Sequence, residues 1–180
     1  MRRYQEAIDA LFNARGWSYW HPLSINGRLY EELGELAREI NHLYGDKKKR
    51  ADEPPGDIEE EIGDVLYAAI CLANRERYDL AWIDRISDDG KHASEDILSA
   101  FAQSAWWGGT LSGAIDRQYG DGDSWQACLF PIFRVEPAIG GVIRALEKLS
   151  WRCGYTLDSA FRKAINKVIV RDKDRFPNGI

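Results

Sequence analysis

Four acidic residues fall in two pairs whose spacing suits metal chemistry. The stretch "EEEIGDVLYAA" (59–69) places Glu61 and Asp64 three residues apart, where a run of glutamates meets an apolar segment. Upstream, "YEELGEL" (30–36) places Glu32 and Glu35 three residues apart. Residues at i and i+3 are neighbours on one face of a helix, so two antiparallel helices would bring the four carboxylates together. Burying such groups costs several kcal/mol unless something compensates their charge.

A bound divalent cation would compensate this charge, which otherwise raises the pKa values of clustered carboxylates. An all-oxygen ligand set suits Mg²⁺ or Mn²⁺, and Mg²⁺ sites commonly combine a few carboxylates with substrate phosphates. A di-iron carboxylate bundle, which is built from Glu-x-x-His elements on its helices, is disfavoured as an alternative. Acidic pairs are also common on solvated helix faces, and we interpret four further glutamates as surface residues of that kind: Glu31, Glu39, Glu59 and Glu60.

The apolar pattern predicts helices that position these pairs and gives an all-α fold class. An apolar stripe at steps of four and three predicts a helix that ends at Gly45; the stripe consists of Leu29, Leu33, Leu36, Ile40 and Leu43. Asp57, with Glu60 three residues on, indicates the N-cap of a helix over 58–76. Further helices are predicted over 3–15, 95–118, 132–152 and 157–174, with a loop over 17–27 and a linker over 85–94.

Composition limits the kind of protein. The chain has 180 residues, 44% of them hydrophobic and 29% charged, which is typical of one soluble globular domain or of two related halves. A net charge of −5 argues against nucleic-acid binding, and no apolar run reaches the roughly 18 residues that a membrane span needs. We expect no signal peptide, three reduced cysteines and a cytoplasmic location. The basic run 47–50 is interpreted as a solvated loop, with phosphate binding as the alternative.

These residues resemble a known family. "EELGE" (31–35), followed after 25 intervening residues by "EIGD" (61–64), is similar to the acidic signature of the MazG-like, all-α nucleoside triphosphate pyrophosphohydrolases. The resemblance spans residues 4 to about 80 and resumes over 157–177. It implies that a nucleotide is cleaved between its α- and β-phosphates, giving a nucleoside monophosphate and pyrophosphate. It also implies four Mg²⁺ ligands: Glu32, Glu35, Glu61 and Asp64.

The remaining site residues follow from that chemistry. A carboxylate near the metal would take a proton from the attacking water, and Glu31 or Glu35 is the candidate general base. Phosphates require basic partners, and a stripe at steps of four along the last predicted helix could supply them: Lys163, Lys167, Arg171 and Arg175. The alternative for this stripe is a solvated face. Two other functions stay open, a nucleotide or metal sensor without turnover and a helical interaction module without a ligand.

The second half of the chain repeats part of the sequence pattern of the first, a similarity that we call the internal echo. Aligning 58–80 with 135–157 pairs apolar and glycine positions, among them Ile62 with Ile139 and Gly63 with Gly140. The acidic positions are lost in this alignment: Glu61 faces Ala138, Asp64 faces Gly141 and Glu35 faces Thr110. We therefore expect a catalytic half with the metal site (1–86) and a degenerate copy with the C-terminal basic helix (87–180), packed as one domain.

This echo predicts an intramolecular pseudo-dimer, with further homodimer formation left open. The paired helices of the two halves would form a four-helix core, with one metal site and one vestigial site. Trp106 and Trp107 would lie near the vestigial site, where their rings could stack on a base or simply pack in the core. Trp17 and Trp20, in the predicted loop before the first acidic helix, are similar candidates for substrate binding.

Overall fold

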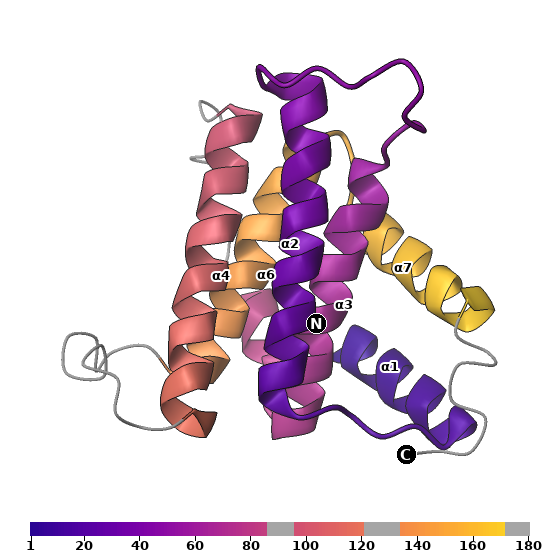
Figure 1. The fold of residues 1–180 in the computed structure, drawn as a ribbon. Coiled ribbons are helices and arrows are strands. Elements are labelled where there is room, and N and C mark those ends of the chain that lie inside the picture. The colour runs from indigo at the N-terminus through magenta and orange to yellow at the C-terminus, as the bar shows by residue number, and fades with distance from the viewer. Residues whose placement is uncertain (86–95, 121–133, 172–180) are drawn as a thin grey trace.

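The computed structural model describes residues 1–85, 96–120 and 134–171 (Figure 1). Its helices in the first half are α1 (Arg2–Arg15), α2 (Pro22–Tyr44), α3 (Ile58–Glu76) and the short 3₁₀ helix η1 (Leu80–Arg85). Those in the second half are α4 (Ile97–Tyr119), α6 (Val135–Arg152) and α7 (Leu157–Arg171). The described residues contain no strand, which confirms the all-α class. None of these helices has the length and apolar character that crossing a membrane requires.

Local signals explain where α1 and α3 begin and end. Gly16 adopts the left-handed conformation (φ 67°) that ends α1, and its N–H donates to the last turn. Asp57 accepts a hydrogen bond from the Glu60 backbone N–H at 3.0 Å and so caps α3 as predicted. Three glutamates follow in the first turn of α3, where the positive end of the helix dipole favours negative charge.

Helix α2 begins earlier than the pattern predicts. The predicted loop over 17–27 is wrong in its second part, because α2 starts at Pro22 and His21 caps it through its side chain. Proline is favoured at the first helical position, where its missing N–H would have no helical partner anyway. Ile25 is buried, so the apolar face of α2 extends one turn before Leu29.

The other end of α2 corrects two further predictions. Leu43 is 61% exposed, so the apolar stripe stops at Ile40. Glu39 is buried rather than on the surface, because Arg38 and Lys49 pair with its two oxygens at 3.1 and 3.0 Å. Glu39 and His42 have the Glu-x-x-His spacing found in di-iron carboxylate bundles, with His42 Nδ1 3.9 Å from Glu39 Oε2. Glu39 is a structural anion held by basic residues and lies outside the cluster of carboxylates described below.

The helices pack as two pairs with two flanking helices. Antiparallel α2 and α3 lie against α4 and α6, with α2 contacting α4 and α3 contacting α6 (Figure 1). α1 and α7 both pack on α3. One continuous cluster of buried apolar residues draws on every described helix. The two halves therefore share a core among the described residues.

The positions aligned in the internal echo lie in this shared core. Eight of them, four on α3 and four on α6, are buried: Ile62, Val65, Ala69, Leu72, Ile139, Val142, Leu146 and Leu149. The two-fold relation between the halves, and thus the pseudo-dimer, stays a prediction. The expected boundary at 86/87 falls within residues 86–95, and most of the predicted linker does too, outside the described residues.

A close approach at Gly63 brings α7 to the acidic part of α3. A Cβ atom at Gly63 would lie 2.2 Å from the backbone oxygen of Ala160, so only glycine permits this contact. Gly63 lies between Ile62 and Asp64, and Ala160 lies in the first turns of α7. The approach therefore sets the basic face of α7 beside the acidic residues of α3.

Candidate active site

Three of the predicted carboxylates come together where α2 faces α3. Oxygen atoms of Glu32, on α2, and of Glu61 and Asp64, on α3, all lie within 4.8 Å of one another. Glu32 and Asp64 are buried and Glu61 is partly buried. The i, i+3 spacing of Glu61 and Asp64 puts both on the α3 face that meets Glu32. We call these three residues the carboxylate trio.

Burial and mutual repulsion destabilise the charged forms of the trio. Burial, followed by the charge of Asp64, raises the pKa of Glu32 to about 7. Burial, followed by the charge of Glu35, raises the pKa of Glu61 to about 7 as well. Burial also raises the pKa of Asp64, although its hydrogen bond from Lys167 opposes the shift. The protein thus concentrates negative charge at a place where it is costly.

The trio fits a divalent cation. Glu32 Oε2 and Glu61 Oε2 are buried oxygens without a hydrogen-bond partner. Unpartnered buried acceptors of this kind are uncommon in folded proteins and call for an explanation. Carboxylate oxygens are the donors that Mg²⁺ and Mn²⁺ prefer, so such an ion would satisfy both the charge and the open oxygens.

Basic residues from two helices compensate part of the charge. On α2, Arg28 Nη1 lies 2.7 Å from Glu31 Oε2, and Nη2 pairs with Glu32 Oε1. On α7, Lys167 Nζ lies 2.6 Å from both Asp64 Oδ2 and Glu60 Oε1. Burial opposes the charge of Lys167, but these contacts with Asp64 and Glu60 raise its pKa overall.

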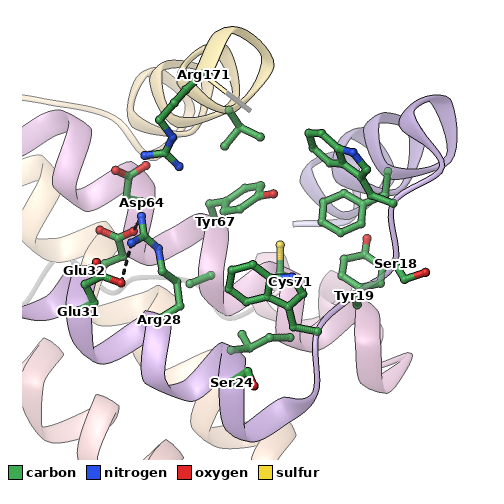
Figure 2. A pocket seen from close by; sticks show the side chains of 16 residues that line it. Ser18, Tyr19, Ser24, Arg28, Glu31, Glu32, Asp64, Tyr67, Cys71 and Arg171 are labelled. Atoms are coloured by element: carbon green, nitrogen blue, oxygen red, sulfur yellow. Dashed lines mark ion pairs between the residues drawn. The ribbon is translucent and has the colours of Figure 1, made fainter. Parts of the chain in front are cut away.

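A cavity of about 350 Å³ opens beside the trio (Figure 2). One end is charged and is lined by Arg28, Glu31, Glu32, Asp64 and Arg171. The other end is largely aromatic and is lined by Phe12, Trp17, Tyr19, Trp20 and Tyr67, with the buried Cys71 between them. Figure 2 shows Arg171 reaching from α7 toward Asp64, with the Arg28 guanidinium below it. A ligand filling this cavity would need a charged end, which meets both carboxylates and guanidinium groups, and a flat apolar end.

Contacts among the aromatic residues hold that end in place. The rings of Phe12 and Tyr19 stack with centroids 4.3 Å apart, and Trp17 meets Phe12 edge-on at 5.7 Å. The Tyr19 hydroxyl donates to Asp9 and accepts from Asn74 Nδ2 at 2.9 Å. The segment between α1 and α2 is therefore tied to α1 and α3, and contacts within the protein hold its aromatic wall.

The other predicted site residues occupy different positions. Glu35 is exposed and outside the trio, although its charge acts on Glu61. Lys163 pairs with Asp57 and lies 3.6 Å from Glu59, outside the lining of the cavity. Trp106 is 57% exposed on α4 and also outside that lining. Trp107 fits closely against Gly141, and Arg175 falls outside the described residues.

Several residues that line the cavity were not predicted from the sequence. Arg28 precedes Glu31 and Glu32 by three and four residues, a spacing that favours ion pairs along a helix and that could have revealed it. Tyr67 follows Asp64 by three residues, so the same periodicity places it on the cavity face of α3. Phe12 and Tyr19 reach the cavity only because α1 packs on α3, and no local signal indicates this.

The fold and the site thus define a class of protein: a helical protein with a buried carboxylate trio beside a cavity that is charged at one end and aromatic at the other. In comparisons with known proteins, the MazG nucleotide pyrophosphohydrolase domain matches residues 21–87. The Bacillus subtilis (strain 168) protein YpjD, itself described as uncharacterized, is 50% identical over 74 residues, which are 41% of this chain and 67% of that protein. The chain belongs to the MazG nucleotide pyrophosphohydrolase family, which confirms the resemblance. No solved structure matches it.

Proposed function

We propose that the protein is a Mg²⁺-dependent nucleoside triphosphate pyrophosphohydrolase, which hydrolyses a nucleotide to its monophosphate and pyrophosphate. The observation that carries this proposal is the pair of unpartnered buried oxygens, on Glu32 and Glu61, beside a cavity with one charged and one aromatic end. A purely structural cluster would be expected to satisfy those oxygens. The family to which the chain belongs supports the reaction class.

Glu32, Glu61 and Asp64 would hold the ion, with Glu35 as a candidate fourth ligand at the exposed edge of the trio. The bound ion would neutralise charge on the phosphates and lower the pKa of a coordinated water. The carboxylates would bind the ion directly, and their burial would keep bulk water from competing for the same oxygens.

Proton transfer and phosphate binding fall to neighbouring residues. The attacking water forms a bond to the α-phosphorus, the bond from that phosphorus to the bridging oxygen breaks, and pyrophosphate leaves. Glu35 is the stronger candidate for the base, because Arg28 already holds Glu31 at 2.7 Å. Arg171, which lines the cavity, is the first candidate phosphate partner on α7, and Lys167, which pairs with Asp64 outside that lining, is the second.

The aromatic end of the cavity is suited to a nucleobase. Base stacking on aromatic side chains is worth about 1–3 kcal/mol per base. Trp17 and Trp20 line this end together with Tyr67, so a base there would leave the triphosphate pointing toward the trio. Trp17 is therefore retained as a proposed substrate-binding residue.

A turnover screen tests the proposal. The full-length protein is incubated with Mg²⁺ and a panel of standard and modified nucleoside triphosphates, and the products are separated by ion-exchange chromatography. We expect equimolar nucleoside monophosphate and pyrophosphate, with no turnover in excess chelator. Release of orthophosphate, or full activity with chelator, would contradict the proposal. Nucleotide binding without any product would favour the sensor instead.

A further inference from the structure

Arg28 lines the cavity beside the carboxylate trio. One side of its guanidinium pairs with Glu32, a member of the trio, and the other side lies 2.7 Å from Glu31. The side chain keeps 28% of its surface exposed and lines the cavity. It therefore contacts one of the groups that would bind a metal ion while facing the space where phosphates would lie.

We propose that Arg28 exchanges partners, holding Glu32 while the trio is empty and binding a nucleotide phosphate once a divalent cation occupies the trio. This inference rests on the proposed function and adds to it a residue with two successive partners. A cation on the open Glu32 Oε2 would share the charge of one carboxylate with the guanidinium on Oε1, so a metal ion at Glu32 weakens the hold of Arg28 on it. The released guanidinium is already at the cavity wall and needs only a change of side-chain conformation.

Once a cation compensates the trio, the two arginines that line the cavity favour an anion there. Burial lowers the pKa of Arg28 and the contacts with Glu31 and Glu32 raise it overall, while the positive charge of Arg171, which lines the cavity from α7, opposes them to a smaller extent. Two guanidinium groups that face one cavity are stabilised when an anion lies between them. The planar guanidinium also presents paired N–H donors that match two phosphate oxygens, which a lysine cannot do.

A second arginine on the same helix provides a matched comparison. Arg38 also pairs with a buried glutamate, Glu39, at 3.1 Å. Lys49 binds the other Glu39 oxygen at 3.0 Å, so this glutamate has no open oxygen. Arg38 does not line the cavity. It is thus a structural counterpart of Arg28, with the same pair type but without the cavity.

Two titrations on full-length protein test the exchange. Isothermal calorimetry measures the affinity for Mn²⁺ without nucleotide, and then the affinity for inorganic tripolyphosphate at saturating Mg²⁺. The variants are Arg28→Gln, Arg28→Lys and the control Arg38→Gln. We expect Arg28→Gln to bind Mn²⁺ about tenfold more tightly and tripolyphosphate about tenfold more weakly, because a competing and phosphate-binding charge is lost. Arg28→Lys should lie between, and Arg38→Gln should match wild type in both.

The opposite signs separate exchange from a structural role. Weaker binding of both probes by Arg28→Gln would mean that Arg28 only organises the trio, and unchanged binding of either probe would also overturn the exchange. The Arg28→Lys variant retains the charge and keeps the test valid if Arg28→Gln folds poorly. If the wild type binds Mn²⁺ and tripolyphosphate but the variants do not differ, the exchange fails and the proposed function stands. Wild type that binds neither probe overturns both.

Discussion

The two helix pairs of the molecule both contribute to the apolar core but differ in what else they bury. In the α2–α3 pair, the trio places three carboxylates at the helix contact. In the α4–α6 pair, the positions aligned with Glu61 and Asp64 carry Ala138 and Gly141, and the position aligned with Glu35 carries Thr110. Ala138 is 1% exposed, and the ring of Trp107 occupies the space that a side chain at Gly141 would need. Small residues and an indole ring thus fill one contact, whereas acids fill the other.

This difference separates what the fold needs from what the site needs. The α4–α6 pair forms an apolar contact without any acid at these aligned positions, so helix packing alone does not call for carboxylates. Uncompensated buried charge destabilises a protein, and replacing it by apolar groups is often neutral or stabilising. The acids of α2 and α3 are therefore best explained by a ligand. Four predictions test this difference between the two helix pairs.

Removing one acid should abolish turnover while sparing the fold. Asp64→Ala or Glu61→Ala should lower kcat/KM by more than about 100-fold, because a ligand to the catalytic ion is lost. The metal-free variant should melt at or slightly above the wild-type temperature, since repulsion within the trio is relieved. Pyrophosphate release and thermal unfolding in chelator measure the two effects. Glu136→Ala, at the α6 position aligned with Glu59, is the control and should retain activity. Near wild-type rates in either trio variant would disprove the metal site.

Adding an acid to the other pair should destabilise it. Ala138→Glu places a carboxylate at the position aligned with Glu61, where the site is closed and apolar. We expect the free energy of unfolding to fall by about 3–5 kcal/mol, because no cation or hydrogen bond compensates the charge. Ala102→Glu, at an exposed position of α4, should change it by less than about 0.5 kcal/mol. Urea unfolding measures both, and equal stability of the two variants would contradict the comparison.

Lower pH should stabilise the metal-free protein, because carboxylates of the trio become protonated and lose their charge. Glu32 and Glu61 have folded-state pKa values of about 7, against an ordinary value of 4.5. Between pH 4.5 and pH 7 the folded state therefore holds more protons than the unfolded state. The free energy of unfolding consequently falls by on the order of 2 kcal/mol as the pH rises through this range. Urea unfolding in chelator at a series of pH values measures this slope.

Two controls assign that slope to the trio. Glu61→Gln should flatten it, because one of the two raised pKa values is removed. Saturating Mg²⁺ should stabilise the protein most above pH 7, since the ion binds the ionised carboxylates. Stability that rises between pH 4.5 and 7 in chelator would contradict the electrostatic account.

Local spacing made much of the fold and the centre of the site predictable. The bounds of α3, its Asp57 cap and the shared face of Glu61 and Asp64 all depend on residues within one or two turns. Contacts between distant segments were not predictable in this way. Glu39 is buried because Lys49 and the backbone around Gly56 cover it, and a Cβ at Gly56 would collide with the Glu39 carboxylate.

The cavity depends on such distant contacts too. Its aromatic end requires α1 and the following segment to pack on α3, which brings Phe12 and Tyr19 to the wall. The sequence offered both Trp17 and Trp106 as candidates for base stacking, and only the packing of the helices shows which of them lines the cavity. Trp17 lines the cavity, whereas Trp106 lies on α4 beside Trp107.

The smallest expected effect tests that distinction between the two halves. Trp17→Ala should raise the KM for the nucleotide about tenfold with little change in kcat, because stacking contributes to binding rather than to bond cleavage. Trp106→Ala removes an equally large ring from the second half and should leave KM within about twofold, since the ring is exposed and away from the cavity. Steady-state kinetics on the best substrate of the screen measure both variants. A larger rise for Trp106→Ala than for Trp17→Ala would move base binding from the α2–α3 side of the molecule to the α4–α6 side, and the second pair would then be a remodelled substrate site rather than packing alone.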